Sequence, residues 1–225
     1  MTTNKTPLAP TERARPRACL ISLDVILVGL GLMCLGLGTA ITVSTPWGAK
    51  PWDIFHLGIV NLTGLSIGRV SQLVSIVAVC LALLLRGSIT WVTVVNAVKV
   101  GFFMDLFLLF MPYVEGIPGL LFLELGVIVS GVGMGLYLAP QWGAGPRDSL
   151  LLAVVRISGL SLSVACVIQD LLLVITGFFL GGPVGLGTLV AAVTSGPWVG
   201  FFVDRIRAKR EAMEGTRQRS SACSM

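Results

Sequence analysis

The chain has 225 residues, of which 55% are hydrophobic and only 12% are charged, and its formal net charge is +5. An ordinary soluble domain carries about 25% charged residues, so this composition excludes one and indicates an integral membrane protein. The positive charges gather mostly at the two ends of the chain, which is typical of cytoplasmic membrane anchors rather than of a nucleic-acid-binding surface.

In chain order we predict a disordered basic tail, a first membrane repeat, a connector, a second membrane repeat and a basic cytoplasmic tail, at residues 1–17, 18–111, 112–119, 120–205 and 206–225. Each repeat contains three apolar segments of roughly the 20 residues that cross a bilayer. The six expected spans lie at about 19–44, 67–86, 89–111, 120–140, 162–180 and 186–204.

One seven-residue motif stands between apolar segments in both repeats. Trp47-Gly-Ala-Lys-Pro-Trp-Asp53 returns as Trp142-Gly-Ala-Gly-Pro-Arg-Asp148, at an offset of 142 − 47 = 95 residues and with five identical positions. The tripeptide Gly-Leu-Ser follows both copies at the same offset, ending at Ser66 and at Ser161. Such an unbroken register indicates an internal duplication.

A short apolar segment follows each motif, at residues 54–62 and 149–157. Nine helical residues cover roughly 14 Å, about half of a 30 Å hydrocarbon core, so these segments cannot cross the membrane. Each repeat then makes three crossings, and an odd number inverts one repeat relative to the other. We therefore expect an all-α membrane protein of about six transmembrane helices, in two inverted three-span repeats that each carry a short half-helix after the motif.

The prolines and aspartates of the motif allow two interpretations. Pro51 and Pro146 fit the first turn of a helix, where Asp53 and Asp148 can cap free N–H groups. Alternatively, the two half-helices meet in mid-membrane and bind a solute. Free N–H groups and Arg147 suit an anionic group, whereas free aspartates suit a cation or a proton. The candidate binding residues are Pro51, Trp52, Asp53, Gly145, Pro146, Arg147 and Asp148.

Ionisable side chains inside the spans are further candidates, because their burial in lipid is costly. Lys99 and Asp170 lie near the middle of their spans and form a candidate ion pair or relay, or else pair structurally. His56, the only histidine, shares a helical face with Asp53 and is either a proton shuttle or a packed side chain. The acidic residues nearer the span ends are expected at the membrane interface: Asp24, Asp105 and Glu124.

No Walker loop, HExxH or CxxC pattern occurs in the chain. Its single histidine has no partner with which to form a catalytic triad. We therefore expect no enzyme, with no catalytic residue, no metal site and no cofactor.

The paired motif and the Gly-Leu-Ser that follows it resemble the YczE/YyaS/YitT family of bacterial integral membrane proteins, in particular its YczE-like branch. The most specific part is the second copy, Gly143-Ala-Gly-Pro-Arg-Asp148. The resemblance covers about residues 20–205 and implies a multi-pass protein of the bacterial inner membrane, without a substrate or a reaction. The first copy has Lys50 and Trp52 where the second has Gly145 and Arg147, so the resemblance implies no strictly symmetric role.

Two functions remain as alternatives. The first is a small inner-membrane transporter or permease, with both termini in the cytoplasm, which binds a small polar or anionic solute between the half-helices. The second is a non-transporting membrane scaffold or regulatory protein. A transporter requires a polar cavity that reaches the paired motifs, whereas a scaffold requires motifs that are packed shut. The expected partners are the lipid bilayer, a small-molecule solute and a second copy of the chain, and no nucleic acid.

Overall fold

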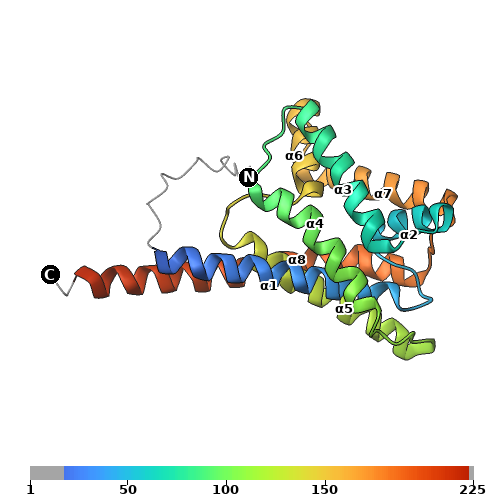
Figure 1. Ribbon diagram of the computed structural model, residues 1–225, viewed down its shortest axis with the longest axis horizontal. Coiled ribbons are helices and arrows are strands. Elements are labelled where there is room, and N and C mark those ends of the chain that lie inside the picture. Colours follow the sequence, from blue (N-terminus) through green and yellow to red (C-terminus); the bar gives the residue numbers. More distant parts are fainter. Residues whose placement is uncertain (1–17, 223–225) are drawn as a thin grey trace, which may run out of the picture.

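The computed structural model describes residues 18–222, which form eight helices and, within this range, no strand (Figure 1). The tail predicted at residues 1–17 lies outside the described residues. The helices are α1 (Ala18–Val43), α2 (Pro51–Thr63), α3 (Ile67–Leu84), α4 (Trp91–Leu108), α5 (Gly116–Leu138), α6 (Pro146–Ser158), α7 (Leu162–Phe179) and α8 (Leu186–Ala222).

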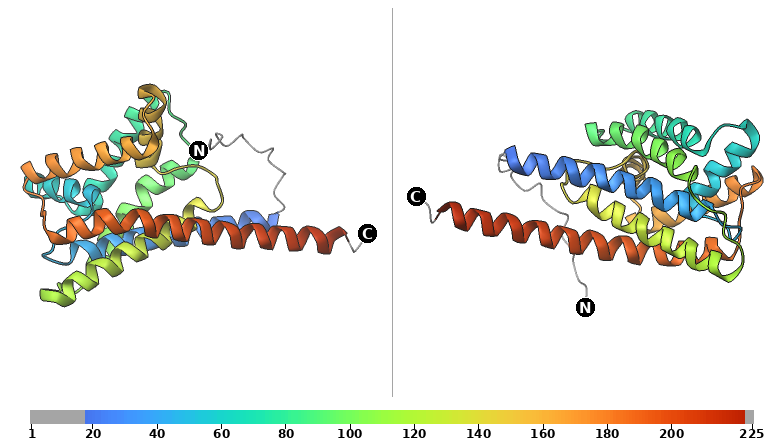
Figure 2. Two further views of the ribbon diagram at one scale, coloured as in Figure 1. Left: turned by 180° about the vertical axis from the view of Figure 1, so that it is seen from behind. Right: turned by 60° about the horizontal axis from the view of Figure 1, so that its bottom comes forward.

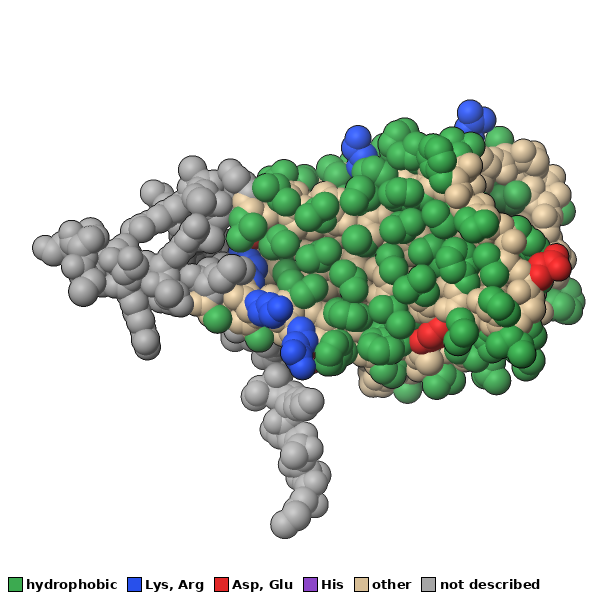
Figure 3. Space-filling model, turned by 90° about the horizontal axis from the view of Figure 1, so that it is seen from below, with side chains coloured by type: hydrophobic (Ala, Val, Ile, Leu, Met, Phe, Trp, Pro, Cys, Tyr) green, Lys and Arg blue, Asp and Glu red, His purple; other side chains and the backbone are tan. Residues whose placement is uncertain are grey.

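Six of these helices are long and apolar enough to cross a membrane, as the sequence predicts: α1, α3, α4, α5, α7 and α8. Large hydrophobic side chains on them point outward, for example Val25, Leu73 and Leu172. Figure 3 shows one face of the molecule covered by hydrophobic side chains, with several Lys and Arg side chains near the end where α1 begins and α8 ends. Such a surface suits the hydrocarbon of a bilayer rather than water.

The other two helices, α2 and α6, have 13 residues each and begin at the motif prolines. At about 1.5 Å per residue each covers roughly 20 Å, which is too short to cross a bilayer. Both are followed by a glycine with a φ of 69°, Gly64 and Gly159, a conformation that residues with a Cβ avoid. Ser66 then caps α3, accepting from the backbone N–H three residues on, and Ser161 caps α7 in the same way.

Helices α1 and α5 form the centre of the fold and run antiparallel (Figure 2). Gly31, in the middle of α1, lies against Gly133, late in α5, and Gly38, late in α1, lies against Gly126, in the middle of α5. A Cβ at any of the four would come within 2.6–2.8 Å of the facing glycine's carbonyl oxygen, so the two backbones are in contact. The offset of 95 exchanges these contacts, because 31 + 95 = 126 and 38 + 95 = 133.

The remaining helices pack around this pair in matching sets. Helix α4 packs on α1 and α8 on α5, while α2 packs on α7 and α6 on α3. Helix α2 lies beside the α7–α8 turn, where the Ile54 carbonyl faces Gly182, and α6 lies beside the α3–α4 turn, where Ala153 faces Gly87. Each short helix therefore packs beside the turn that joins the last two long helices of the other half of the chain.

One packing contact has no counterpart in the second half. Helix α3 packs along α4, and the Asp105 carboxylate on α4 accepts hydrogen bonds from Ser66 Oγ (2.6 Å) and from the Gly68 N–H (2.8 Å). Asp105, expected at the membrane interface, thus joins these two helices. Over the described residues, α7 and α8 do not pack along one another in this way, and a Cβ at Gly196 of α8 would have no atom within 4 Å.

Helix α8 is 37 residues long, so the basic tail predicted from residue 206 begins as a continuation of this helix. Within this continuation Arg210 forms an ion pair with α1 and donates to both carboxylate oxygens of Asp24, from Nε at 3.1 Å and from Nη2 at 3.0 Å. Arg210 also donates to the Ala139 carbonyl at 3.2 Å. Asp24, which was expected at the membrane interface, is only 1% exposed and is therefore buried against other helices.

We expect Gly126→Ala to lower the stability of the protein. The added methyl group would meet the Gly38 carbonyl oxygen at 2.7 Å and the Thr42 backbone nitrogen at 2.9 Å, and overpacking of this kind typically costs about 1–3 kcal/mol. Gly29→Ala is the matched control, because Gly29 is exposed and an added Cβ meets nothing within 4 Å. The measurement is the thermal unfolding midpoint in detergent. Equal midpoints for the two variants would contradict a direct backbone contact.

Candidate functional site

A cavity of about 340 Å³ lies between the two short helices and is lined by the first turn of each. All seven candidate binding residues of the two motifs line it. His56 on α2 and Asp170 on α7 line the same cavity. The structure therefore brings together two motifs that are 95 residues apart in the sequence.

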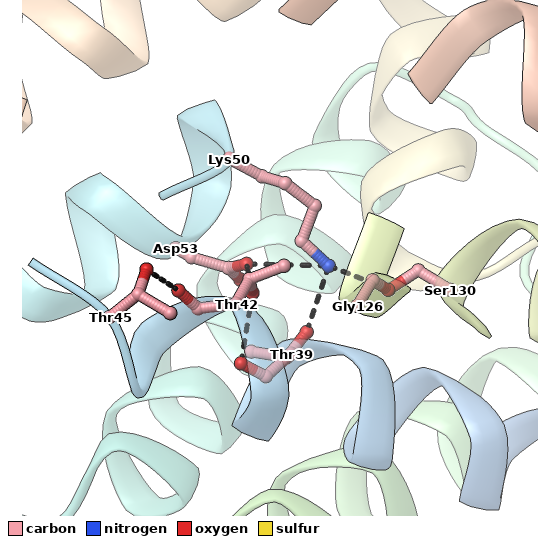
Figure 4. A network of polar contacts seen from close by, with 7 residues as sticks. All are labelled: Thr39, Thr42, Thr45, Lys50, Asp53, Gly126 and Ser130. Atoms are coloured by element: carbon pink, nitrogen blue, oxygen red, sulfur yellow. Dashed lines mark hydrogen bonds and ion pairs between the residues drawn. The ribbon is translucent and has the colours of Figure 1, made fainter. Parts of the chain in front are cut away.

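Lys50 organises the side of the cavity formed by the first motif (Figure 4). Its ammonium group donates to Thr39 Oγ1 (3.1 Å) and to Ser130 Oγ (2.8 Å), and it pairs with the Asp53 carboxylate at 3.3 Å. Thr42 Oγ1 also donates to Asp53, at 3.3 Å. The side chains of Lys50 and Asp53 are 18% and 6% exposed, so each charge is compensated by the other and by fixed hydroxyl groups rather than by bulk water.

The second motif builds a related arrangement without a lysine. Tyr137 Oη donates to Asp148 at 2.5 Å, and Arg147 Nε pairs with the same carboxylate at 3.4 Å. The Tyr137–Asp148 bond corresponds to the Thr42–Asp53 bond, because both partners are displaced by 95 residues. The positive charge, however, comes from Arg147 rather than from position 145.

The two motifs touch one another across the cavity. The Arg147 guanidinium lies over the indole ring of Trp52, 5.9 Å from its centroid. These two residues are also counterparts, since 52 + 95 = 147. A cation over an aromatic face is attracted by the electron-rich ring, and the attraction is stronger away from water.

The motif aspartates bond to side chains rather than to the backbone of their own helix. Asp53 is bonded to Thr42 and Lys50, and Asp148 to Tyr137 and Arg147. The first residues of α2 and α6 have no side-chain cap in the described structure. The interpretation of Pro-x-Asp as a self-capped helix start is therefore wrong, although a carboxylate near the positive end of a helix dipole is still favourable.

Several polar groups that line the cavity have no strong partner. Trp52 Nε1 and His56 Nδ1 are buried without a hydrogen bond in the described structure. Asp170 is bonded only to the thiol of Cys166, at 4.0 Å. Buried polar groups are normally hydrogen-bonded, so unpartnered groups around a cavity indicate where a polar ligand can bind.

Lys99 is not part of this arrangement. It is exposed on α4, with its ammonium group 6.0 Å from the ring centroid of Phe102, and in the described structure no ion pair joins it to Asp170. The candidate Lys99–Asp170 pair is therefore wrong, because a mid-span position predicts depth in the membrane and not the helix face. Glu124 also lies away from the cavity and accepts hydrogen bonds from Thr194 and Trp198 of α8.

Sequence reasoning missed Lys50, Thr42 and Tyr137 as residues of the site. Lys50 stands directly before the helix-starting proline, and its partners Thr39 and Ser130 lie on other helices, so the sequence gives no sign of its contacts. Thr42 and Tyr137 stand 11 residues before the motif aspartates in both halves. A comparison of hydrogen-bonding side chains at equivalent positions, instead of identical ones, finds this pair.

We expect Lys50→Met to destabilise the protein, because it leaves the buried Asp53 carboxylate without its cation. Removing one partner of a buried ion pair typically costs about 3–5 kcal/mol. The double variant Lys50→Met/Asp53→Asn removes both charges and should recover much of that loss. Unfolding midpoints of the wild type, both single variants and the double variant in detergent form the test, and strictly additive effects would rule out a direct pair.

Comparison with known proteins gives one family and several relatives. A family of unknown function, DUF6198, matches residues 23–204. The uncharacterized membrane protein YczE of Bacillus subtilis is 30% identical over 171 residues, which are 74% of this chain and 79% of YczE. An uncharacterized protein of Haemophilus influenzae is 30% identical over 186 residues, 82% of this chain and 84% of that protein.

The uncharacterized protein YyaS of Bacillus subtilis is 25% identical over 180 residues, 78% of this chain and 90% of YyaS. No solved structure matches significantly. The resemblance to YczE and YyaS that the paired motif predicts is thereby confirmed.

Proposed function

We propose that this chain, which belongs to the DUF6198 family of unknown function, is a small transporter or permease for a small polar or anionic solute. Its apolar helices and its similarity to YczE make it a multi-pass membrane protein. The observation that carries the proposal is the cavity lined by both motifs, because a scaffold with no solute to bind requires no such cavity. We propose the bacterial inner membrane as its location, and binding and passage of the solute without an enzymatic step.

In this proposal helices α1–α4 and α5–α8 are inverted repeats. The antiparallel contact of α1 and α5 supports this arrangement, because the offset of 95 exchanges its glycine pairs. The matching hydrogen bonds Thr42–Asp53 and Tyr137–Asp148 support it as well. Inverted-repeat transporters bind their solutes near the bilayer midplane, where the repeats meet and where broken helices offer free backbone groups.

The unequal packing of the two repeats suits an inward-facing state of the transporter. Basic side chains flank the beginning of α1 and the end of α8, so the positive-inside rule puts that end of the molecule in the cytoplasm. The separation of α7 from α8 then opens the cavity toward the cytoplasm, while the α3–α4 contact at Asp105 closes the opposite side. The solute crosses when α7 packs against α8 and α3 separates from α4.

Flux through liposomes tests the transport proposal. Purified protein should move at least one member of a panel of radiolabelled small polar and anionic solutes. Asp148→Asn and Arg147→Gln should each lower that flux about tenfold or more, because each removes a charge that lines the cavity. Arg69→Gln is the control, since Arg69 is exposed on α3 and does not line the cavity. Wild-type flux in both site variants would refute the site, and a panel that does not move would favour the scaffold.

Labelling of Cys166 tests the direction in which the cavity opens. A variant that keeps Cys166 as its sole cysteine should react with a charged, membrane-impermeant thiol reagent in inside-out vesicles and not in right-side-out vesicles. The control keeps only Cys80, which is exposed on α3 outside the cavity. Because Cys80 should face lipid, the reagent should not label it in either kind of vesicle. Labelling of Cys166 only from the outer face would overturn the inward-facing assignment.

A further inference from the structure

We propose that the cavity binds a small zwitterion, with the carboxylate of the ligand at Arg147 and Trp52 and its cationic group at Asp170. This inference rests on the proposed solute site and deepens it by naming the class of solute. It is carried by the balance of charges in the cavity and by the positions of the groups without partners.

The cavity is lined by two basic and three acidic side chains: Lys50, Arg147, Asp53, Asp148 and Asp170. Lys50 pairs with Asp53 at 3.3 Å and Arg147 with Asp148 at 3.4 Å. Asp170 is left without an ion pair among the described residues, and its one hydrogen bond comes from a thiol. A carboxylate that lines a cavity among membrane-spanning helices and has no ion-pair partner attracts positive charge, so a ligand with a cationic group suits this side of the cavity.

Hydrogen-bond donors without acceptors also belong to side chains that line the cavity. In the described structure Arg147 bonds to Asp148 through Nε, which leaves its two terminal nitrogens able to donate. The buried Trp52 Nε1 has no acceptor, and the contact between the Arg147 guanidinium and the Trp52 ring keeps both donors together. A guanidinium fork matches the two oxygens of a carboxylate, and the start of α6 adds the positive end of a helix dipole.

Solutes with a single charge fit this arrangement less well. An anion alone would leave Asp170 unpaired, and a cation alone would leave the donors of Arg147 and Trp52 without acceptors. Much of the remaining lining is apolar and suits an aliphatic side chain: Leu35, Val100, Met104, Val127, Met134 and Leu151. The volume of about 340 Å³ is at the small end of the range of roughly 300–1,000 Å³ for ligand pockets, which favours a molecule of amino-acid size.

Matched ligands separate the two charges of a zwitterion. The purified full-length protein in detergent is titrated with the neutral α-amino acids, and binding is read from the unfolding midpoint and from equilibrium dialysis. Leucine, leucinamide and 4-methylpentanoate share one aliphatic body. Leucine carries both charges, leucinamide carries only the positive charge and 4-methylpentanoate carries only the negative charge. The zwitterion that binds most tightly should bind about tenfold or more tightly than its amide or its deaminated acid, because each of these lacks one charge contact.

Variants assign the two ends of the ligand. Asp170→Asn should lower the affinity for the zwitterion about tenfold or more and leave the affinity for the deaminated acid unchanged. Trp52→Phe keeps the aromatic face, removes the N–H and should weaken both of these ligands. Asp204→Asn is the control, because Asp204 is exposed on α8 outside the cavity.

Two results would overturn the proposal. The first is equal affinity for the amino acid and its deaminated acid together with no effect of Asp170→Asn, which would make Asp170 a proton-binding group instead. The second is no binding of any α-amino acid. If the protein then moved another solute across liposome membranes, the transport proposal would stand and only the assignment of a zwitterionic solute would be rejected.

Discussion

The whole arrangement depends on the direct backbone contact between α1 and α5. Lipid provides no hydrophobic force that drives one apolar helix onto another, so close van der Waals packing must hold these helices together. Glycines at the crossing permit that approach. The contact also sets the polar site, because it holds Thr42 and Tyr137 beside the motif aspartates and Ser130 within reach of Lys50. A side chain at the crossing would therefore disturb the cavity as well as the packing.

The two motifs compensate the charge of a carboxylate in different ways. Each puts a carboxylate near the start of a short helix inside a low-dielectric region, and each supplies a hydroxyl donor from the preceding long helix. Lys50 compensates the first carboxylate and also bonds to two hydroxyl groups, which uses its donors within the protein. Arg147 compensates the second and retains free donors toward the cavity. The charges of the first motif are therefore compensated more fully within the protein than those of the second.

Much of the fold could be predicted from the sequence, because the length of each apolar span and the offset of 95 residues between the motifs are read directly from the sequence without knowledge of packing. The motif likewise predicted residues that line the cavity. Contacts between distant positions could not be predicted in this way. Arg210 resembles a residue of a basic tail until Asp24, 186 positions earlier, is seen beside it. Lys99 and Asp170 stand at similar positions along their helices, yet only Asp170 is on a helix face that lines the cavity.

The reciprocal glycine contact of α1 and α5 is of the kind that two identical chains make about a two-fold axis. In a homodimer of two identical half-length chains, both members of every pair of equivalent positions are necessarily the same residue. Covalent fusion of the halves removes that restriction. Lys50 is then matched with Gly145, and Trp52 with Arg147, so that unlike side chains stand at equivalent positions of the repeated motif. A single chain that carries two unequal copies of the motif thus allows a polarity across the cavity that identical subunits could not have.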